Sequence, residues 1–264
     1  MSASSSRSLG ARLRSTTGLL RVLVPRETRI RYRTSLLDVA WAFLTPLALL
    51  AVYGVVLTSF GVEVQSGDYL TSAWIGLVLW TYFSTVLGSA VTSLVGSADL
   101  VTKVYFPREA LPLATSGAAL LDLGIGVASV LVLFPLRGGT FGWSALLLPL
   151  PLLVIVVWSA ALAVLTSVSA VFLRDLVHGV HLALRVGFFA TPVVYDATVL
   201  PDALRWTEQV NPVAVSIEGV RAVLLGGSRP DMLATGVQLA AGLALLGGAV
   251  LLTRRLEADV ADAL

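Results

Sequence analysis

Two histidines, His178 and His181, lie three residues apart, a spacing that puts both side chains on one face of a helix. Such a pair could bind a metal ion, but Asp175 is the only carboxylate close to it. The alternative is a pair of histidines at the polar end of a membrane helix, and we favour this interpretation. The sequence has no cysteine, no Gly-x-Ser-x-Gly motif and no paired-carboxylate cluster. We therefore expect neither a metal site nor catalytic residues.

The only lysine, Lys103, follows Thr102 and precedes Val104. A phosphate-binding loop needs Gly-Lys followed by Ser or Thr, because the lysine contacts the phosphates. No such loop can exist in this chain. If ATP drives its activity, a second polypeptide must supply the ATPase.

Two ionisable residues, Asp122 and Arg185, lie within otherwise apolar stretches. They could form an ion pair between two helices, and Asp122 could then serve an ion-coupled carrier. Alternatively, Arg185 extends to the membrane surface and Asp122 makes one structural contact. A single carboxylate favours the structural alternative.

The composition places these residues in a membrane protein. Apolar residues form 56% of the 264 residues, charged residues 13%, and the mean hydropathy is +0.88. We predict an all-α membrane protein with one transmembrane domain over 39–264, because each apolar run approaches or exceeds the roughly 20 residues that cross a bilayer. The six predicted transmembrane helices cover about 39–60, 69–95, 110–134, 143–172, 177–195 and 232–252.

Residues 1–38 form a basic segment in which arginines alternate with clusters of apolar residues. This pattern predicts an amphipathic helix on an anionic membrane surface, interrupted near Pro25. The alternative is a solvated basic tail. The arginines and tyrosine expected to contact lipid or a lipid-linked pyrophosphate are Arg26, Arg29, Arg31, Tyr32 and Arg33.

The distribution of Lys and Arg predicts the orientation. Thirteen fall on the side that holds the N-terminal segment and four on the other side, with Arg185 left out because it lies within a helix. Loops rich in Lys and Arg remain in the cytoplasm. Both termini are therefore expected on the cytoplasmic side, as is the segment KVYFPREALP (103–112).

That segment is short, polar and rigid between two apolar runs. Pro107 and Pro112 restrict the backbone, Tyr105 and Phe106 offer aromatic anchors, and the charged residues could form ion pairs at the rim of an interface. From the residues alone, a docking segment and an ordinary turn next to the membrane are equally good interpretations.

The outer loop contains an apolar helical pattern over 211–227 that is too short to span a bilayer. We predict short re-entrant helices there, with Glu218 and Arg221 spaced to pair. Aromatic side chains suit a path for sugars, and Trp74 and Trp80 are expected at the membrane belt or mouth. The path candidates are Tyr53, Trp74, Trp80, Tyr82, Phe83, Phe188, Phe189 and Tyr195.

Four stretches resemble the membrane subunits of ABC-2 type exporters, specifically the polysaccharide and teichoic-acid permeases. They are RETRIRYRTSLLDVAWAFLTPL (26–47), LVTKVYFPREALPLA (100–114), VFLRDLVHGVHLALRVGFFATPVVY (171–195) and NPVAVSIEGVRAVLLGG (211–227). They occur in the order that the family shows and extend over nearly the whole chain.

The resemblance implies a homodimeric permease of the bacterial cytoplasmic (inner) membrane that docks two copies of a separate ATPase. That partner would bind ATP and Mg; the chain itself would hold no cofactor and bind no nucleic acid. The implied cargo is a lipid-linked polysaccharide such as O-antigen, galactan or teichoic acid. An exporter of small hydrophobic molecules and an ion-coupled carrier that uses Asp122 remain as alternatives.

The resemblance also implies roles for two sets of residues. The ATPase-docking segment would comprise Asp99, Lys103, Tyr105, Phe106, Pro107, Arg108 and Glu109. An outer gate would comprise Asn211, Pro212, Glu218 and Arg221.

Overall fold

The structure is a computed structural model that describes residues 9–32, 44, 47–52, 55, 67–103, 106–195 and 210–263. Every regular element in these ranges is a helix, which confirms the all-α prediction for this part of the chain. The longer helices are α1 (Leu9–Tyr32), α3 (Gly67–Ala90), α5 (Ala110–Leu136), α6 (Pro149–Phe172), α7 (Leu176–Ala190), α9 (Pro212–Leu224) and α10 (Met232–Arg255). The shorter elements are η1 (Val95–Ser97), α4 (Ala98–Lys103), η2 (Trp143–Leu147) and α11 (Glu257–Ala263).

Four stretches are long and apolar enough to cross a membrane: Tyr69–Ala90, Ala110–Leu136, Trp143–Phe172 and Met232–Arg255. They agree with four of the six predicted transmembrane helices. The predicted fifth corresponds to α7, which has only 15 residues. The predicted first, 39–60, lies mostly outside the described residues, so the total of six stays a prediction.

Two predicted boundaries are wrong. The prediction extends the second transmembrane helix to about residue 95, whereas in the structure α3 ends at Ala90 and a turn follows. The fifth continues to residue 195, whereas α7 ends at Ala190. Thr191 is extended, with φ −107° and ψ 138°, because the proline at position 192 disfavours helical geometry in the residue before it.

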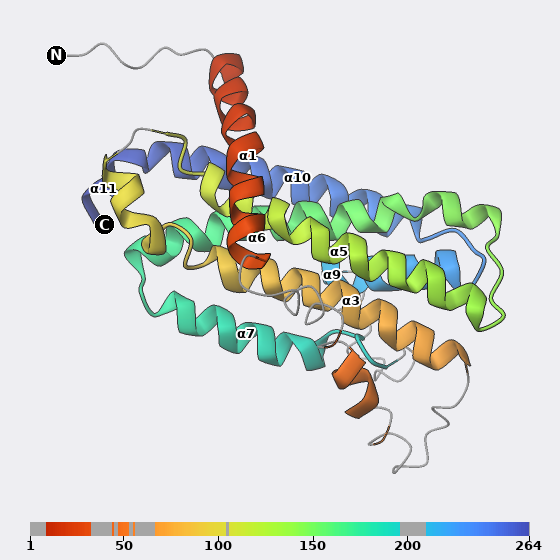
Figure 1. The fold of residues 1–264 in the computed structure, drawn as a ribbon. Coiled ribbons are helices and arrows are strands. Elements are labelled where there is room, and N and C mark those ends of the chain that lie inside the picture. Colours follow the sequence, from red (N-terminus) through yellow and green to blue (C-terminus); the bar gives the residue numbers. More distant parts are fainter. Residues whose placement is uncertain are drawn as a thin grey trace.

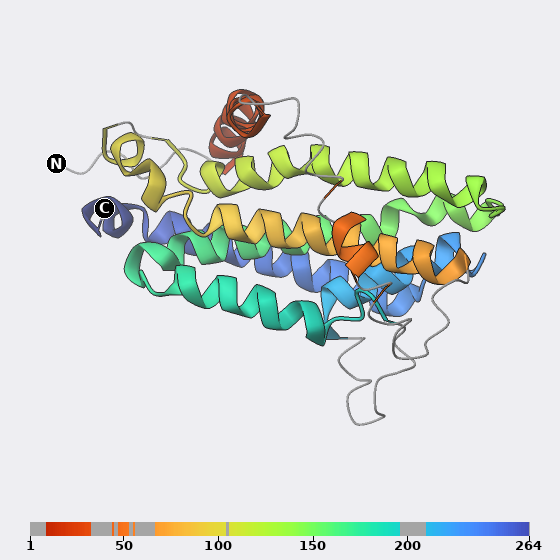
Figure 2. The ribbon, with the colours of Figure 1, turned by 60° about the horizontal axis from the view of Figure 1, so that its bottom comes forward.

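The long helices α3, α5, α6 and α10 lie side by side with α7 along the edge (Figure 1). The shorter α9 packs on α3, α6 and α10 towards one end of this bundle. At the other end lie α4 and α11 (Figures 1 and 2). We call these the α9 end and the α4 end.

Helix α1 crosses the bundle at a steep angle and packs on α5 (Figure 1). The predicted interruption near Pro25 is wrong, because α1 continues through this residue. Pro25 removes the helical hydrogen bond to the carbonyl of Arg21. Both residues are exposed, so water or a donor group of a lipid headgroup can hydrogen-bond to that carbonyl.

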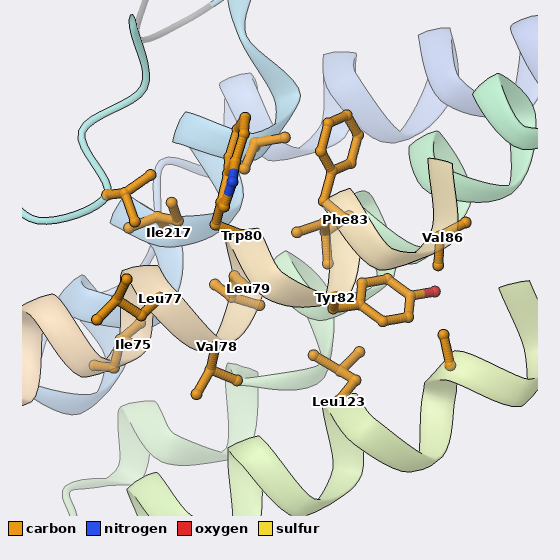
Figure 3. Close-up of a cluster of buried hydrophobic side chains, with 14 of the residues drawn as sticks. Ile75, Leu77, Val78, Leu79, Trp80, Tyr82, Phe83, Val86, Leu123 and Ile217 are labelled. Atoms are coloured by element: carbon orange, nitrogen blue, oxygen red, sulfur yellow. The ribbon is translucent and has the colours of Figure 1, made fainter. Parts of the chain in front are cut away.

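Two apolar clusters hold the helices together. The larger one centres on α3, where Trp80 and Phe83 project to one side while Val78 and Tyr82 approach Leu123 of α5 (Figure 3). The smaller one lies at the α4 end and joins α1, α4, α5, α6 and α11. Its buried members are Leu23, Leu94, Val101, Phe106, Ala110, Leu111, Ala114, Val168, Val171 and Val260.

Candidate functional site

The segment at the α4 end has an exposed part and a buried part. In α4, Lys103 Nζ lies 2.8 Å from Asp99 Oδ1, and both side chains are largely exposed. Phe106 is buried in the smaller apolar cluster, whose members come from both halves of the chain. Phe106 therefore anchors the segment to its own bundle and is not an exposed anchor for a partner. Pro107 is half-buried, and Tyr105 lies outside the described residues.

Arg108 and Glu109 are buried, so the expectation that their charges lie at an exposed rim is wrong. Arg108 Nη1 donates to the carbonyl of Val101 at 2.9 Å. Glu109, 2% exposed, accepts from Arg254 at the end of α10, with 2.9 Å to Nε and 2.8 Å to Nη2. The Glu109 carboxylate can be buried here because Arg254, 145 positions later in the sequence, compensates its charge. This pair ties the start of α5 to the end of α10.

Helix α1 is attached to the bundle by a second ion pair. Arg31 Nη1 lies 2.8 Å from Asp122 Oδ2 on α5, and Arg31 Nη2 donates to Ser89 Oγ of α3 at 3.4 Å. The considered pairing of Asp122 with Arg185 is therefore wrong. Arg26 forms an ion pair with the neighbouring Glu27, at 3.5 Å, on the exposed face.

Of the remaining α1 candidates, Arg29 is exposed, whereas the Tyr32 side chain and Arg33 lie outside the described residues. Asp122 thus has a structural partner, which supports the alternative in which it makes a structural contact.

We expect Asp122→Asn and Arg31→Gln to cause the same defect, a loss of about 1–2 kcal/mol in the attachment of α1. The double variant should be no worse than either single variant, because each removes the same half-buried contact. Thermal unfolding of the purified variants measures this loss of stability. Arg29→Gln, at an exposed position of α1, is the control. An ion relay predicts otherwise: Asp122→Asn would abolish transport while Arg31→Gln left it intact.

At the α9 end, the side chain of Asn211 caps the start of α9. Asn211 Oδ1 accepts from the backbone N–H groups of Val213 at 3.0 Å and Ala214 at 3.4 Å, and Pro212 occupies the first helical position. Asn211 Nδ2 also donates to Thr191 Oγ1 at 2.8 Å. The cap therefore fixes α9 to the segment after α7.

Arg221 is the polar centre of the α9 end. The predicted pair with Glu218 is confirmed, with Nη1 2.7 Å from Oε1. The same guanidinium also donates to four backbone carbonyls in two separate segments: those of Ser72, Pro192, Val193 and Tyr195, at 2.8–3.4 Å. Arg221 is 7% exposed, so it joins α3, α9 and the segment after α7 in a buried network.

Gly76 permits the close approach of α3 to the segment after α7. Its role was not predicted from the sequence. A Cβ at position 76 would overlap the carbonyl oxygen of Val193, a contact that no side chain can make. Only glycine lets α3 approach the carbonyl that Arg221 binds. A glycine inside an apolar helix was the sole sequence signal of this close approach.

A groove of about 660 Å³ lies between α3 and α7. Its aromatic side chains are Trp80, Phe188 and Phe189, with Trp80 and Phe188 in edge contact at 5.8 Å between ring centres. Its polar lining is a row of hydroxyls from α3 and two basic side chains from α7: Thr81, Ser84, Thr85, Ser89, His181 and Arg185. Leu49, Gly88 and Leu184 complete the lining. Hydroxyls and aromatic faces are the groups that a sugar chain would contact.

The other aromatic path candidates do not line this groove. Trp74 is buried and donates from Nε1 to Ser129 Oγ of α5 at 2.9 Å, so it packs against its own bundle. Its place at the membrane belt or mouth stays a prediction. Tyr82 and Phe83 are buried in the larger apolar cluster. Tyr195 donates from its hydroxyl to the carbonyl of Phe189 at 3.0 Å, and Tyr53 lies outside the described residues.

The comparisons with known proteins agree with this architecture. The sequence profile described as ABC-2 type transporter matches residues 18–225. The chain is similar to a protein named O-antigen export system permease protein RfbA from Myxococcus xanthus, with 32% identity over 216 residues, 81% of this chain and 83% of that protein. It is also similar to a protein of the same name from Klebsiella pneumoniae, with 25% identity over 216 residues, 80% of this chain and 81% of that protein. This multi-pass membrane protein belongs to the ABC-2 type transporter family, in which it is a permease subunit and not an enzyme.

Proposed function

We propose that this chain is the membrane subunit of an exporter that moves a lipid-linked polysaccharide out of the cytoplasm. The observation that supports this cargo most strongly is the similarity, over about four fifths of the chain, to proteins named O-antigen export permeases. The groove between α3 and α7 adds a chemical reason, because it combines aromatic faces with a row of hydroxyls. O-antigen, galactan and teichoic acid all fit this class.

In this proposal two copies of the chain form the path in the bacterial cytoplasmic membrane, and membrane lipids surround them. The α4 end and both termini face the cytoplasm, in accord with the excess of Lys and Arg there. The α9 end faces outward, where Asn211, Pro212, Glu218 and Arg221 hold the segments that form the outer gate. Two copies of a separate ATPase dock at the α4 end and bind ATP and Mg.

The buried residues of the α4 end suggest how the ATPase would act on the bundle. Its contact surface would be the exposed face of α4, which carries Asp99 and Lys103. Phe106, Arg108 and Glu109 lie behind that face and join it to α6, α10 and α11. A displacement of α4 by the ATPase would then be transmitted to several transmembrane helices at once.

To test the docking surface, we would exchange the charges of its exposed ion pair. Lys103→Glu and Asp99→Lys are each expected to reduce the amount of ATPase that copurifies with the permease, by about threefold or more. The double variant D99K/K103E keeps an attractive pair within α4 but reverses the charges that a partner meets. If the ATPase recognises these charges, the amount of ATPase that copurifies stays low in the double variant. If it returns to the wild-type level, the pair only supports α4, and the docking surface lies elsewhere.

The cargo is tested in cells that lack their own copy of the permease. Expression of the chain with its ATPase is expected to restore polysaccharide on the cell surface and to leave the efflux of small hydrophobic dyes unchanged. Dye efflux without surface polysaccharide would instead support the exporter of small hydrophobic molecules.

A further inference from the structure

Arg185 is a charged side chain in an unusual place. It lies nine residues into α7, about 14 Å from the start of that helix at 1.5 Å per residue, and it is exposed. Among the residues that the structure describes, it has neither an ion pair nor a hydrogen-bonded partner. A guanidinium at this depth is costly next to lipid, so the assembled transporter must offer it water or an anion.

The part of the chain that the structure describes offers no free anion at this depth. Within the four long apolar helices of the described chain, the only carboxylate away from a helix end is Asp122. Asp122 is already bound to Arg31 on α1. A second copy of the chain therefore has no carboxylate at this depth, within the described ranges, that could pair with Arg185.

His181 adds a second polar group to the same wall of the groove. It lies four residues before Arg185, one turn away on the same face of α7. Its Nδ1 is 2.7 Å from the carbonyl of Val177 and must donate to it, since a carbonyl only accepts. Its Nε2 points towards α3 at Gly88, where a Cβ would lie 3.8 Å away. That nitrogen is therefore directed into the groove.

Opposite these two residues, α3 contributes hydroxyls and Trp80 contributes an aromatic face. A guanidinium next to hydroxyl donors matches the oxygens of a phosphate, which accept several hydrogen bonds at once. We propose that the groove binds a phosphate-bearing group, with Arg185 as the main ligand and His181, protonated on both ring nitrogens so that Nε2 can also donate, as a secondary one. The inference rests on the proposed function for its preferred source, the phosphate or pyrophosphate that links a glycan to its lipid; the alternative source is the headgroup of an anionic membrane lipid.

The test measures binding of farnesyl pyrophosphate to the purified full-length permease in phosphatidylcholine nanodiscs. Arg185→Gln is expected to weaken binding by about tenfold or more, because one charge-assisted contact is lost. Arg185→Lys should weaken it less, and Arg137→Gln, which removes an exposed charge outside the groove, should leave it unchanged. Farnesol, which lacks the phosphates, should bind equally to all variants. Equal binding of farnesyl pyrophosphate to wild type and Arg185→Gln overturns the inference.

His181→Gln provides a second variant in case Arg185→Gln does not fold, and is expected to weaken binding by a smaller factor. An unchanged affinity in His181→Gln would contradict its role as a ligand. The source of the phosphate is assigned by replacing part of the phosphatidylcholine with phosphatidylglycerol. If this lipid displaces farnesyl pyrophosphate, the site is supported and its occupant is a lipid headgroup; if it does not, the site is supported with the lipid-linked cargo as its source.

The nanodisc assay requires neither ATPase nor export, so the two proposals can fail separately. Unchanged binding in Arg185→Gln, together with normal polysaccharide export, refutes the phosphate site alone. Arg185-dependent binding without any polysaccharide export refutes the proposed cargo alone.

Discussion

Arg221→Met is expected to destabilise the permease by at least about 3 kcal/mol, equivalent to a fall of roughly 6–12 °C in melting temperature. The substitution leaves four backbone carbonyls around a buried position without their donor and Glu218 without its cation. Methionine fills a similar volume, so the effect reports lost hydrogen bonds and not a cavity. Thermal unfolding of the detergent-purified protein measures it.

Arg229→Met is the matched control for this prediction, because Arg229 is exposed near the same end of the bundle. It should change the melting temperature by no more than about 1–2 °C. Arg221→Lys should recover only part of the stability, since an ammonium cannot reach carbonyls on several sides as the guanidinium does. A melting temperature in Arg221→Met equal to that of the control would show that the network around Arg221 does not hold the outer segments.

Arg254→Met is expected to cost about 3–5 kcal/mol, because it leaves the buried carboxylate of Glu109 without its compensating charge. Its position at the α4 end adds a functional consequence. The start of α5 would no longer be tied to α10, so ATP hydrolysis by the partner should be less tightly linked to transport. Transport per ATP hydrolysed by the reconstituted complex measures this second effect.

Arg255 provides a control one residue away, since its side chain is exposed. Arg255→Met should remain within about 0.5 kcal/mol of wild type. The double variant E109R/R254E restores a pair of opposite charges and should regain part of the stability that each single reversal loses. If Arg254→Met and Arg255→Met behave alike, the buried pair is not the link between these helices.

Much of the architecture could be predicted from local patterns. Hydropathy over about 20 residues identified the four long helices, because lipid requires an uninterrupted apolar surface. The contact between Glu218 and Arg221 was predictable from helical spacing, since residues three apart lie on the same face. The cap at Asn211 likewise depends only on its immediate neighbours.

The contacts that hold the site together could not be predicted in this way, because they join distant positions. Glu109 and Arg254 are 145 residues apart, and Arg31 and Asp122 are 91 apart. Spacing carries no information about such pairs. For the same reason the charged residues of the 103–112 segment were expected on the surface, whereas two of them are buried against partners from other helices. The backbone carbonyls that Arg221 binds are not identified by the residue types around them, apart from the glycine at position 76 that lets α3 approach one of them.

The most direct measurement uses proteoliposomes that contain a fluorescent lipid-linked oligosaccharide and the purified chain, with or without its ATPase subunit. Movement of the oligosaccharide across the bilayer is predicted only when both proteins and ATP are present. Movement with the chain alone, or no movement of the oligosaccharide in a complex that hydrolyses ATP and transports small hydrophobic dyes, would contradict the account.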